Sequence, residues 1–269
     1  MKRPPTILMR ARDRERRRLL RGAVAAAGAA ALSGCDRLSN NPSFIETLKG
    51  AQRLSHSAAK VVAPRAAMAQ EFGPQDIAPV FRSNGTLDPR DADYRQLRAA
   101  GFADYRLAVG GLVEKPGEWS LEELRAMPSR TQITRHDCVE GWSCIGKWKG
   151  VPLAHVLERV KPLPAAKFVL FRCFDSMGDP SPTAPDSRYY ETIDLDDATH
   201  AQTILAYELN DRPLPVSNGA PLRCRVERQL GYKQAKYVRA IELVTSFDQM
   251  RGGKGGYWED EGYEWYGGI

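Results

Sequence analysis

The sequence predicts an α+β fold with a mixed sheet, in a single domain that spans residues 76–269. Runs of β-forming residues are interspersed with short amphipathic helices, yet neither a βα unit nor any longer segment repeats. No G-x-G-x-x-G follows an expected strand, which argues against a doubly wound nicotinamide-binding domain. These observations favour a sheet whose strands pair in more than one direction.

Alternation and capping residues predict the order of the elements. Alternating apolar residues indicate a strand over 105–113, and Ser120 with Glu123 forms the capping-box pair of a helix that ends by Pro128. Further strands are expected at 131–136, 167–174, 189–195 and 204–209, a helix at 153–160, and a pair of strands at 224–226 and 237–243 around the loop 228–236.

Residues 1–35 have the order of an export signal to the periplasm. Arg16–Arg21 resembles a twin-arginine motif, and the apolar run Gly22–Leu32 is too short to span a membrane. Leu32-Ser33-Gly34-Cys35 resembles a lipoprotein processing box, in which Cys35 would carry a lipid that tethers the chain to a membrane. An ordinary basic N-terminus, and cleavage without lipidation, are the alternatives. Residues 36–75 are expected to be a tether.

The charge of the chain resides mostly in this leader. The net charge is +6, but residues 1–35 hold nine Lys/Arg and two Asp/Glu, so the remaining 30 basic and 31 acidic residues give −1. No basic stripe interleaved with aromatic residues occurs either. The composition therefore does not indicate a nucleic-acid partner.

Cys138 is the candidate chemical centre, because its neighbours are polar and charged. His136, Asp137 and Glu140 flank it, and Gly141 gives the backbone freedom beside it. A strand over 131–136 would deliver the thiol at its end. A purely structural cysteine is more often found in an apolar strand or helix.

Several roles for Cys138 remain open on these residues alone. A zinc site with His136 and Cys144 lacks a pattern for the fourth ligand, and a disulfide with Cys144 is conceivable. A cysteine hydrolase would need a distant base such as His155 or His200, and a structural thiol is the simplest alternative. A single thiolate ligand to a soft metal on an organic cofactor fits best with two further segments.

These two segments have the composition of anion-binding loops. Ser217–Arg223 combines a flexible turn with an arginine, and Arg228–Lys236 combines a glycine with lysines and an arginine. Glycine-released amides together with Lys and Arg are suited to a phosphate. A solvated basic loop is the alternative for the second segment.

Several motifs in order give the chain a family resemblance. DCVEGW, WKGVPL, LAYELN, PLPVSNGAPLR and the Gly-Tyr-Lys loop resemble the sulfite oxidase superfamily of molybdopterin-dependent oxidoreductases, over about residues 80–269. The VEGW context is closest to the bacterial periplasmic branch that includes the methionine sulfoxide reductase catalytic subunit. The resemblance implies a mixed α+β fold that holds Mo-molybdopterin. Because this cofactor is assembled in the cytoplasm, a twin-arginine route, which carries folded proteins, agrees with it.

The resemblance also implies roles for individual residues. Cys138 falls at the position of the molybdenum-ligating cysteine, and Tyr189 at that of an active-site tyrosine, with Tyr190 as its competitor. Cys173 stands where relatives carry a cofactor-contacting threonine. The cofactor-binding positions implied in this way are Asn84, Cys173, Asn218, Arg223, Gln234, Ala235 and Lys236.

The reaction implied is a two-electron oxygen-atom transfer on a small oxo-substrate, either reduction of an S- or N-oxide or a sulfite-type oxidation. Val139–Trp142 stands where sulfite oxidases carry a Gly-Asn-Arg-Arg type stretch, and the carboxylate of Glu140 there would repel sulfite. The haem and dimerisation domains of longer relatives have no room, so a separate cytochrome or membrane haem protein is the expected electron-transfer partner. A non-catalytic periplasmic lipoprotein that binds or scaffolds is the alternative.

The segment from Gly252 onward is rich in glycine and aromatic residues, including Trp258 and Tyr263. It is expected to act either as a lid or as a packing segment. Packing of the aromatic residues into the core is the favoured interpretation.

Overall fold

The computed structural model describes residues 41–44, 46–47, 50, 66–177 and 187–269. Contacts divide the chain into two units, 1–63 and 64–269. The predicted export signal and Cys35 lie outside the described residues. Within the described part of the chain, no helix has both the length and the apolar character that a membrane crossing needs.

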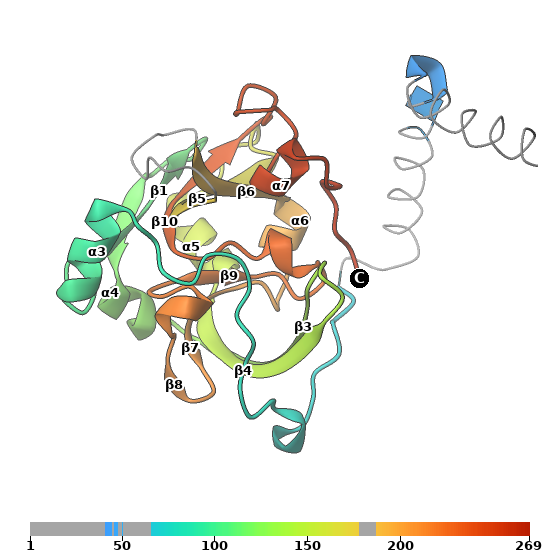
Figure 1. The fold of residues 1–269 in the computed structure, drawn as a ribbon. Coiled ribbons are helices and arrows are strands. Elements are labelled where there is room, and N and C mark those ends of the chain that lie inside the picture. The colour runs from blue at the N-terminus through green and yellow to red at the C-terminus, as the bar shows by residue number, and fades with distance from the viewer. Residues whose placement is uncertain (1–40, 45, 48–49, 51–65, 178–186) are drawn as a thin grey trace, which may run out of the picture. The chain divides into compact units, whose positions relative to one another are not determined.

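The first sheet of the unit 64–269 contains five strands in the order β2-β1-β10-β5-β6 (Figure 1). β1 runs parallel to β10, and the other neighbours are antiparallel, which confirms the predicted mixed sheet. The strands are β1 (Arg106–Gly111), β2 (Gly117–Ser120), β5 (Phe168–Ser176), β6 (Arg188–Asp194) and β10 (Val238–Val244).

The second sheet has the order β3-β4-β7-β8, and β9 also pairs with β7. Its neighbours are all antiparallel. The strands are β3 (Arg130–Asp137), β4 (Ser143–Pro152), β7 (Ile204–Leu209), β8 (Arg212–Pro213) and β9 (Arg223–Arg225).

Short helices connect the strands, as expected for an α+β fold. The predicted capping box of α4 is present, because Ser120 accepts from the amide of Glu123 and Glu123 accepts from the amide of Ser120. The helices are α3 (Ala92–Ala99), α4 (Leu121–Ala126), α5 (Leu153–Val160), α6 (Leu195–Ala198) and α7 (Tyr257–Asp260), with 3-10 turns η1 (Pro74–Asp76), η3 (Val216–Asn218) and η4 (Gly231–Lys233).

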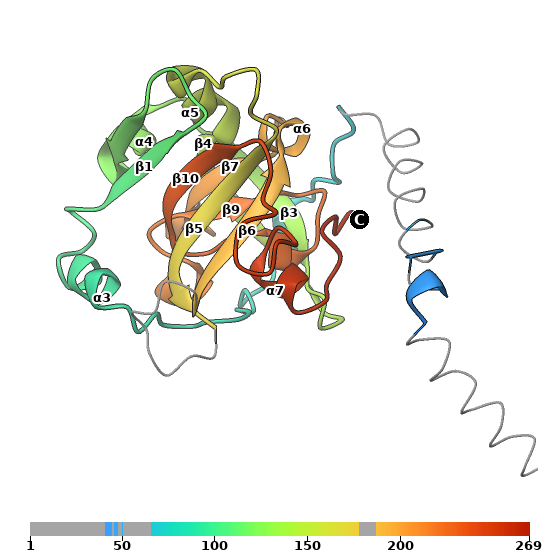
Figure 2. The ribbon, with the colours of Figure 1, turned by 90° about the horizontal axis from the view of Figure 1, so that it is seen from above.

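One hydrophobic core joins the two sheets. Val169 and Ile241 of the first sheet and Val151 and Leu205 of the second belong to the same cluster of buried side chains, together with Leu157 of α5. Burial of apolar surface from both sheets in one cluster stabilises their packing. Figure 2 shows the first sheet from above, with α7 against β6.

β9 and β10 do not form the predicted strand pair. They lie in different sheets, because both edges of β10 are occupied by β1 and β5, while β9 pairs with β7. β9 still meets the loop that precedes β10 at a backbone hydrogen bond, from Cys224 N to the carbonyl of Ala235 at 2.8 Å. The loop between them therefore crosses from one sheet to the other.

The compact unit also begins before residue 76, the predicted start of the domain. Glu71 forms an isolated bridge with Thr134 of β3, and the amide of Ala69 donates to Gln202 Oε1 at 2.7 Å. These residues belong to the segment expected to be a tether. Backbone pairing with β3 is the reason that they join the fold.

Candidate active site

Cys138 lies immediately after β3, in the turn that leads into β4. Its amide donates to the carbonyl of Trp142 and its carbonyl accepts from Gly141, both at 2.9 Å, and Gly141 takes the positive φ of 84° that closes the turn. The side chain of Cys138 is 8% exposed, whereas Val139 beside it is 47% exposed. The turn thus holds the thiol just below the surface.

The thiol faces a cavity that gathers residues from distant parts of the sequence. Five of the predicted site residues line it together, namely Asn84, Cys138, Tyr189, Gln234 and Lys236. The other lining residues are Gly85, Thr86, Val139, Glu140, Asp175, Met177, Gly231, Tyr232, Trp258 and Tyr263. Burial raises the pKa of the Cys138 thiol, although nearby Arg82 and Arg223 act in the opposite direction.

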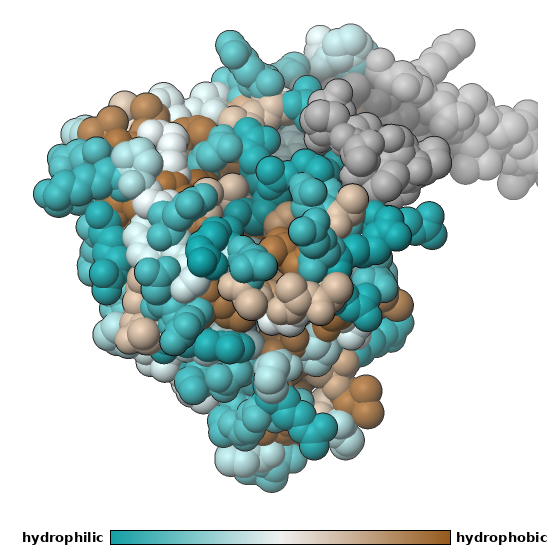
Figure 3. Space-filling view, turned by 90° about the vertical axis from the view of Figure 1, so that its left-hand side faces the viewer, coloured by the Kyte–Doolittle hydropathy of each residue, from teal (hydrophilic) through white to brown (hydrophobic). Residues whose placement is uncertain are grey.

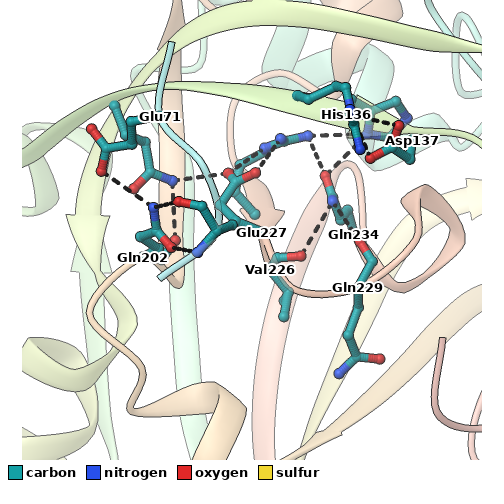
Figure 4. Close-up of polar contacts among 12 residues, drawn as sticks. Glu71, His136, Asp137, Gln202, Val226, Glu227, Gln229 and Gln234 are labelled. Atoms are coloured by element: carbon teal, nitrogen blue, oxygen red, sulfur yellow. Dashed lines mark hydrogen bonds and ion pairs between the residues drawn. The ribbon is translucent and has the colours of Figure 1, made fainter. Parts of the chain in front are cut away.

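A chain of buried polar side chains connects to β3, the strand that precedes Cys138 (Figure 4). His136 Nδ1 is 3.2 Å from Gln234 Oε1 and 3.1 Å from Arg225 Nη1, and Arg225 pairs with Glu227 at 2.6 Å. The chain continues through Gln132, which donates to Glu227 at 2.8 Å. These contacts connect β3, which ends just before Cys138, to the loop that carries Gln234.

Close backbone approach completes this link. A Cβ atom on Gly231 would lie 2.3 Å from His136 Cε1, so only glycine lets η4 lie against the histidine. Burial, followed by repulsion from Arg223 and Arg225, holds the pKa of His136 well below its ordinary value. The neutral imidazole is therefore favoured at this position.

The next feature is a basic floor, which we define as Asn218, Arg223 and Lys236. Arg223 is fully buried in β9, and its guanidinium donates to the carbonyl of Asn218 at 3.2 Å and to Asn84 Oδ1 at 3.4 Å. Lys236 Nζ donates to the carbonyls of Asn84 and Ser217, both at 2.7 Å. Asn84 connects the floor to the cavity.

The floor is electrostatically incomplete. Arg223 Nε and Asn218 Nδ2 are buried donors that lack an acceptor among the described residues. Burial, together with Arg225, lowers the pKa of Arg223 to about 9, and burial together with Arg223 lowers the pKa of Lys236 to about 7. An anion placed here would accept from these donors and stabilise both cations.

Asp175 is a cavity residue that the sequence analysis missed. It lies near the end of β5, is 4% exposed, and its Oδ1 lacks a donor among the described residues. Burial raises its pKa to about 6, against the lowering effect of Lys236. A single acidic residue at the end of a mostly apolar and buried strand was the available signal.

Tyr189, and not its competitor Tyr190, lines the cavity. The hydroxyl of Tyr189 donates to the carbonyl of Tyr232, and its ring stacks on Tyr257 at 5.8 Å and 22°. The hydroxyl of Tyr190 instead donates to Asp260. Tyr189 therefore supports the loop around η4 as well as facing the cavity.

The other four predicted residues, Cys173, Asn218, Arg223 and Ala235, do not line the cavity. Cys173 is completely buried in β5, and Ala235 is buried between Gln234 and Lys236. Cys138, Cys144, Cys173 and Cys224 are all free, and neither His155 nor His200 lines the cavity. Across residues 66–177 and 187–269, His, Cys, Asp and Glu form no group of three or more suited to a metal ion.

The loop next to the floor is attached to the C-terminal segment by an ionic cluster, which we define as Glu191, Lys233 and Glu259. All three side chains are fully buried, and Lys233 Nζ pairs with both carboxyl groups. Burial raises the pKa of Glu191 well above its ordinary value, which favours the protonated form of Glu191. The cluster is then neutral.

Comparison with known proteins decides the family. Residues 95–250 match the family described as oxidoreductase molybdopterin binding domain. A putative protein-methionine-sulfoxide reductase subunit of Azospira oryzae is 39% identical over 204 residues, which cover 73% of this chain and 70% of the relative. The chain belongs to the molybdopterin-binding oxidoreductase family. The predicted enzyme class, α+β fold and Mo-molybdopterin cofactor are thereby confirmed.

Two further relatives are protein-methionine-sulfoxide reductase catalytic subunits. That of Xanthomonas axonopodis pv. citri is 39% identical over 156 residues (55% of this chain, 47% of the relative), and that of Ralstonia nicotianae is 34% identical over 178 residues (65% and 50%). The chain thus spans about half the length of these catalytic subunits. Among solved structures, the sulfane dehydrogenase SoxCD of Paracoccus pantotrophus aligns with a TM-score of 0.48 and 23% identity, over 56% of this chain and 40% of that chain.

The cavity residues, together with the basic floor that Lys236 and Asn84 connect to the cavity, fit the cofactor of this molybdopterin-binding oxidoreductase. Molybdopterin carries a phosphate and a pterin ring with N–H groups, and its metal accepts a thiolate ligand. The unpartnered donors of Arg223 and Asn218 suit the anionic part, the unpartnered oxygen of Asp175 suits an N–H group, and the Cys138 thiol suits the metal. The residues thus offer a partner for each kind of group.

Proposed function

We propose that this oxidoreductase reduces organic sulfoxides by two-electron oxygen-atom transfer. The balanced reaction is R₂SO + 2 e⁻ + 2 H⁺ → R₂S + H₂O. Support comes from the names of the relatives and from the cavity, in which a single cysteine thiol faces aromatic side chains and carboxyl groups. The cavity rim carries Glu140 rather than an arginine, which favours a neutral or cationic substrate over sulfite.

The observation that carries this proposal is a cavity lined by both Cys138 and Lys236 of the basic floor, with Arg223 of the floor hydrogen-bonded to the lining residue Asn84. We propose that Cys138 ligates the molybdenum, and that Asn84, Asn218, Arg223, Gln234, Ala235 and Lys236 hold the pterin and its phosphate, with Cys173 behind them. The bound cofactor supplies the two-electron oxo chemistry. Tyr189 and Asp175, both in the cavity, are our candidates for contacting substrate or cofactor.

The proposal includes the location and the partner of the enzyme. The leader at Arg16–Arg21 supports export to the periplasm by the twin-arginine route, and Cys35 supports a lipid tether. Electrons would come from a separate cytochrome or membrane haem protein. Expression with a reporter fused after residue 75, followed by fractionation and mass spectrometry of the mature N-terminus, tests both features.

A reduced-dye assay with the purified molybdenum enzyme tests the reaction. Oxidation of reduced viologen should follow addition of methyl phenyl sulfoxide or methionine sulfoxide, and sulfite should not reduce the oxidised dye. Cys138→Ser should lower kcat at least 100-fold, while Cys144→Ser, which is buried outside the cavity, should keep activity. Full activity of Cys138→Ser would refute the ligand assignment, and turnover of N-oxides alone would refute the substrate class.

A further inference from the structure

The C-terminal segment contributes one side of the cavity. Trp258 and Tyr263 line the same space as Cys138, and their rings stack at 5.2 Å and 22°. We define these two side chains as the aromatic wall. Val139 and Glu140 of the turn after β3 also line the cavity, so two segments far apart in the sequence border it.

The aromatic wall follows the residues that match the family model. The family match covers residues 95–250, and within it lie Cys138, Asp175, Tyr189, Gln234 and Lys236. Trp258 and Tyr263 follow that match. The matched residues thus include the thiol and the floor, whereas the segment that follows them supplies the aromatic surface.

This segment is held firmly against the rest of the domain. Glu259 belongs to the buried ionic cluster, and the hydroxyl of Tyr257 donates to the carbonyl of Met177 at 2.6 Å. Trp265 Nε1 donates to Thr192 Oγ1 at 2.8 Å, and the amide of Leu230 donates to the carbonyl of Gly267 at 2.7 Å. Anchors on both sides of Trp258 and Tyr263 fix the wall before any substrate arrives.

We propose that Trp258 and Tyr263 select the substrate, and that they favour neutral or cationic sulfoxides with an aromatic or extended apolar substituent. This inference rests on the proposed sulfoxide reduction. The aromatic faces offer apolar contact and stacking for such a substituent, worth about 0.5–1.5 kcal/mol beyond the buried area. Glu140, on the rim of the same cavity, disfavours anionic substrates.

The test compares a small with an aromatic substrate on Trp258→Ala. The KM for methyl phenyl sulfoxide should rise about tenfold, the KM for dimethyl sulfoxide should change less than threefold, and kcat should be kept for both. Trp258→Phe, which keeps an aromatic face, should restore most of the preference. Val80→Ala is the matched surface control, because Val80 is 81% exposed and does not line the cavity. Equal changes for both substrates would overturn the proposal.

A binding measurement separates this proposal from the proposed function. Calorimetric titration of methyl phenyl sulfoxide into the oxidised molybdenum enzyme, without an electron donor, should give a Kd about tenfold weaker for Trp258→Ala than for wild type. If the wild type binds the sulfoxide but does not turn it over, sulfoxide reduction is rejected and substrate selection by the aromatic wall stands. If the enzyme turns the sulfoxide over and Trp258→Ala does not change the substrate preference, only the proposal for the wall is rejected. If Trp258→Ala loses molybdenum, Tyr263→Ala decides by the same two measurements, because Tyr263 is 37% exposed and is easier to truncate.

Discussion

The basic floor reaches the cavity through Lys236, and the aromatic wall through both of its side chains, but the two are built in different ways. In the floor, Arg223 and Asn218 carry buried donors without acceptors, and burial lowers the pKa values of Arg223 and Lys236. In the segment that carries the wall, the buried Glu259 pairs with Lys233, and the hydroxyl of Tyr257 donates to the carbonyl of Met177. The floor therefore gains partners from an anionic ligand, whereas the wall is positioned by contacts within the protein.

The largest expected effect comes from removing the cation of the ionic cluster. Lys233→Met leaves two buried carboxyl groups without their partner, which should lower the free energy of unfolding by about 3–5 kcal/mol. Lys147→Met is the matched control, because Lys147 pairs with the exposed Asp211 and should cost at most about 1 kcal/mol. Urea denaturation of both variants measures the difference. Similar losses for the two lysines would show that the ionic cluster does not anchor the segment that carries the wall.

The next effect is a pH dependence at Asp175, which lines the same cavity as Lys236 of the floor. The pKa of Asp175 is about 6 in the folded protein, against an ordinary value of 3.8, so its contribution to stability is present below about pH 4 and is lost as the pH rises through 6. Between pH 4 and pH 7, the stability of Asp175→Asn relative to wild type should therefore rise by about 2 kcal/mol.

Urea denaturation of cofactor-free protein at several pH values measures this difference. Asp88→Asn, at an exposed carboxylate paired with Arg98, controls for the loss of a charge. A relative stability that does not change with pH would show that burial does not raise the pKa of Asp175.

The third prediction separates ligand binding from folding. Arg223→Met should lower the molybdenum content of purified protein about tenfold, because the anion loses a buried cation. The stability of the cofactor-free protein should change by less than about 1 kcal/mol, since burial of the incompletely bonded guanidinium is itself costly.

Mass spectrometry of bound molybdenum and urea denaturation of the cofactor-free protein provide the two measurements. Arg98→Met, at an exposed ion pair, is the control for both. Loss of stability without loss of molybdenum would show that Arg223 stabilises the fold and does not bind the anion.

The smallest effect concerns the rim. Glu140 accepts from Trp142 Nε1 at 2.7 Å, and Glu140→Gln keeps this acceptor while removing the charge. The KM for a cationic sulfoxide should rise about twofold at low ionic strength and not at high ionic strength, and the KM for a neutral one should stay constant. Steady-state kinetics at two salt concentrations decide this, and a rise for both substrates would point to a steric effect instead.

The sequence predicted most of the strands and helices because apolar residues recur along them at regular spacing. It missed β4, since two of the buried positions of that strand are glycines, Gly146 and Gly150, which leave no apolar pattern to see. A Cβ on Gly150 would lie 2.2 Å from the carbonyl oxygen of Leu205, so close packing against β7 requires the glycine there. Local patterns also could not show that β9 and β10 join different sheets.

For the site, the motif order predicted five residues that the fold brings to one cavity, but their individual roles remain predictions. Asp175 was missed because a buried carboxyl group at a strand end looks like an ordinary polar loop residue in sequence. The C-terminal segment does both of the things that the sequence analysis set as alternatives, because it packs against the domain and also borders the cavity. Trp265 stacks on Phe247, whereas Trp258 and Tyr263 face the cavity.

The ionic cluster has a consequence for biosynthesis. Lys233 lies next to Gln234 in the loop that borders the cavity, and it meets its partner Glu259 only near the end of the printed sequence. While the chain is being translated, Cys138 leaves the ribosome long before the segment that encloses it. Insertion of the cofactor is therefore expected to be a post-translational event, acting on a chain whose synthesis has passed residue 259.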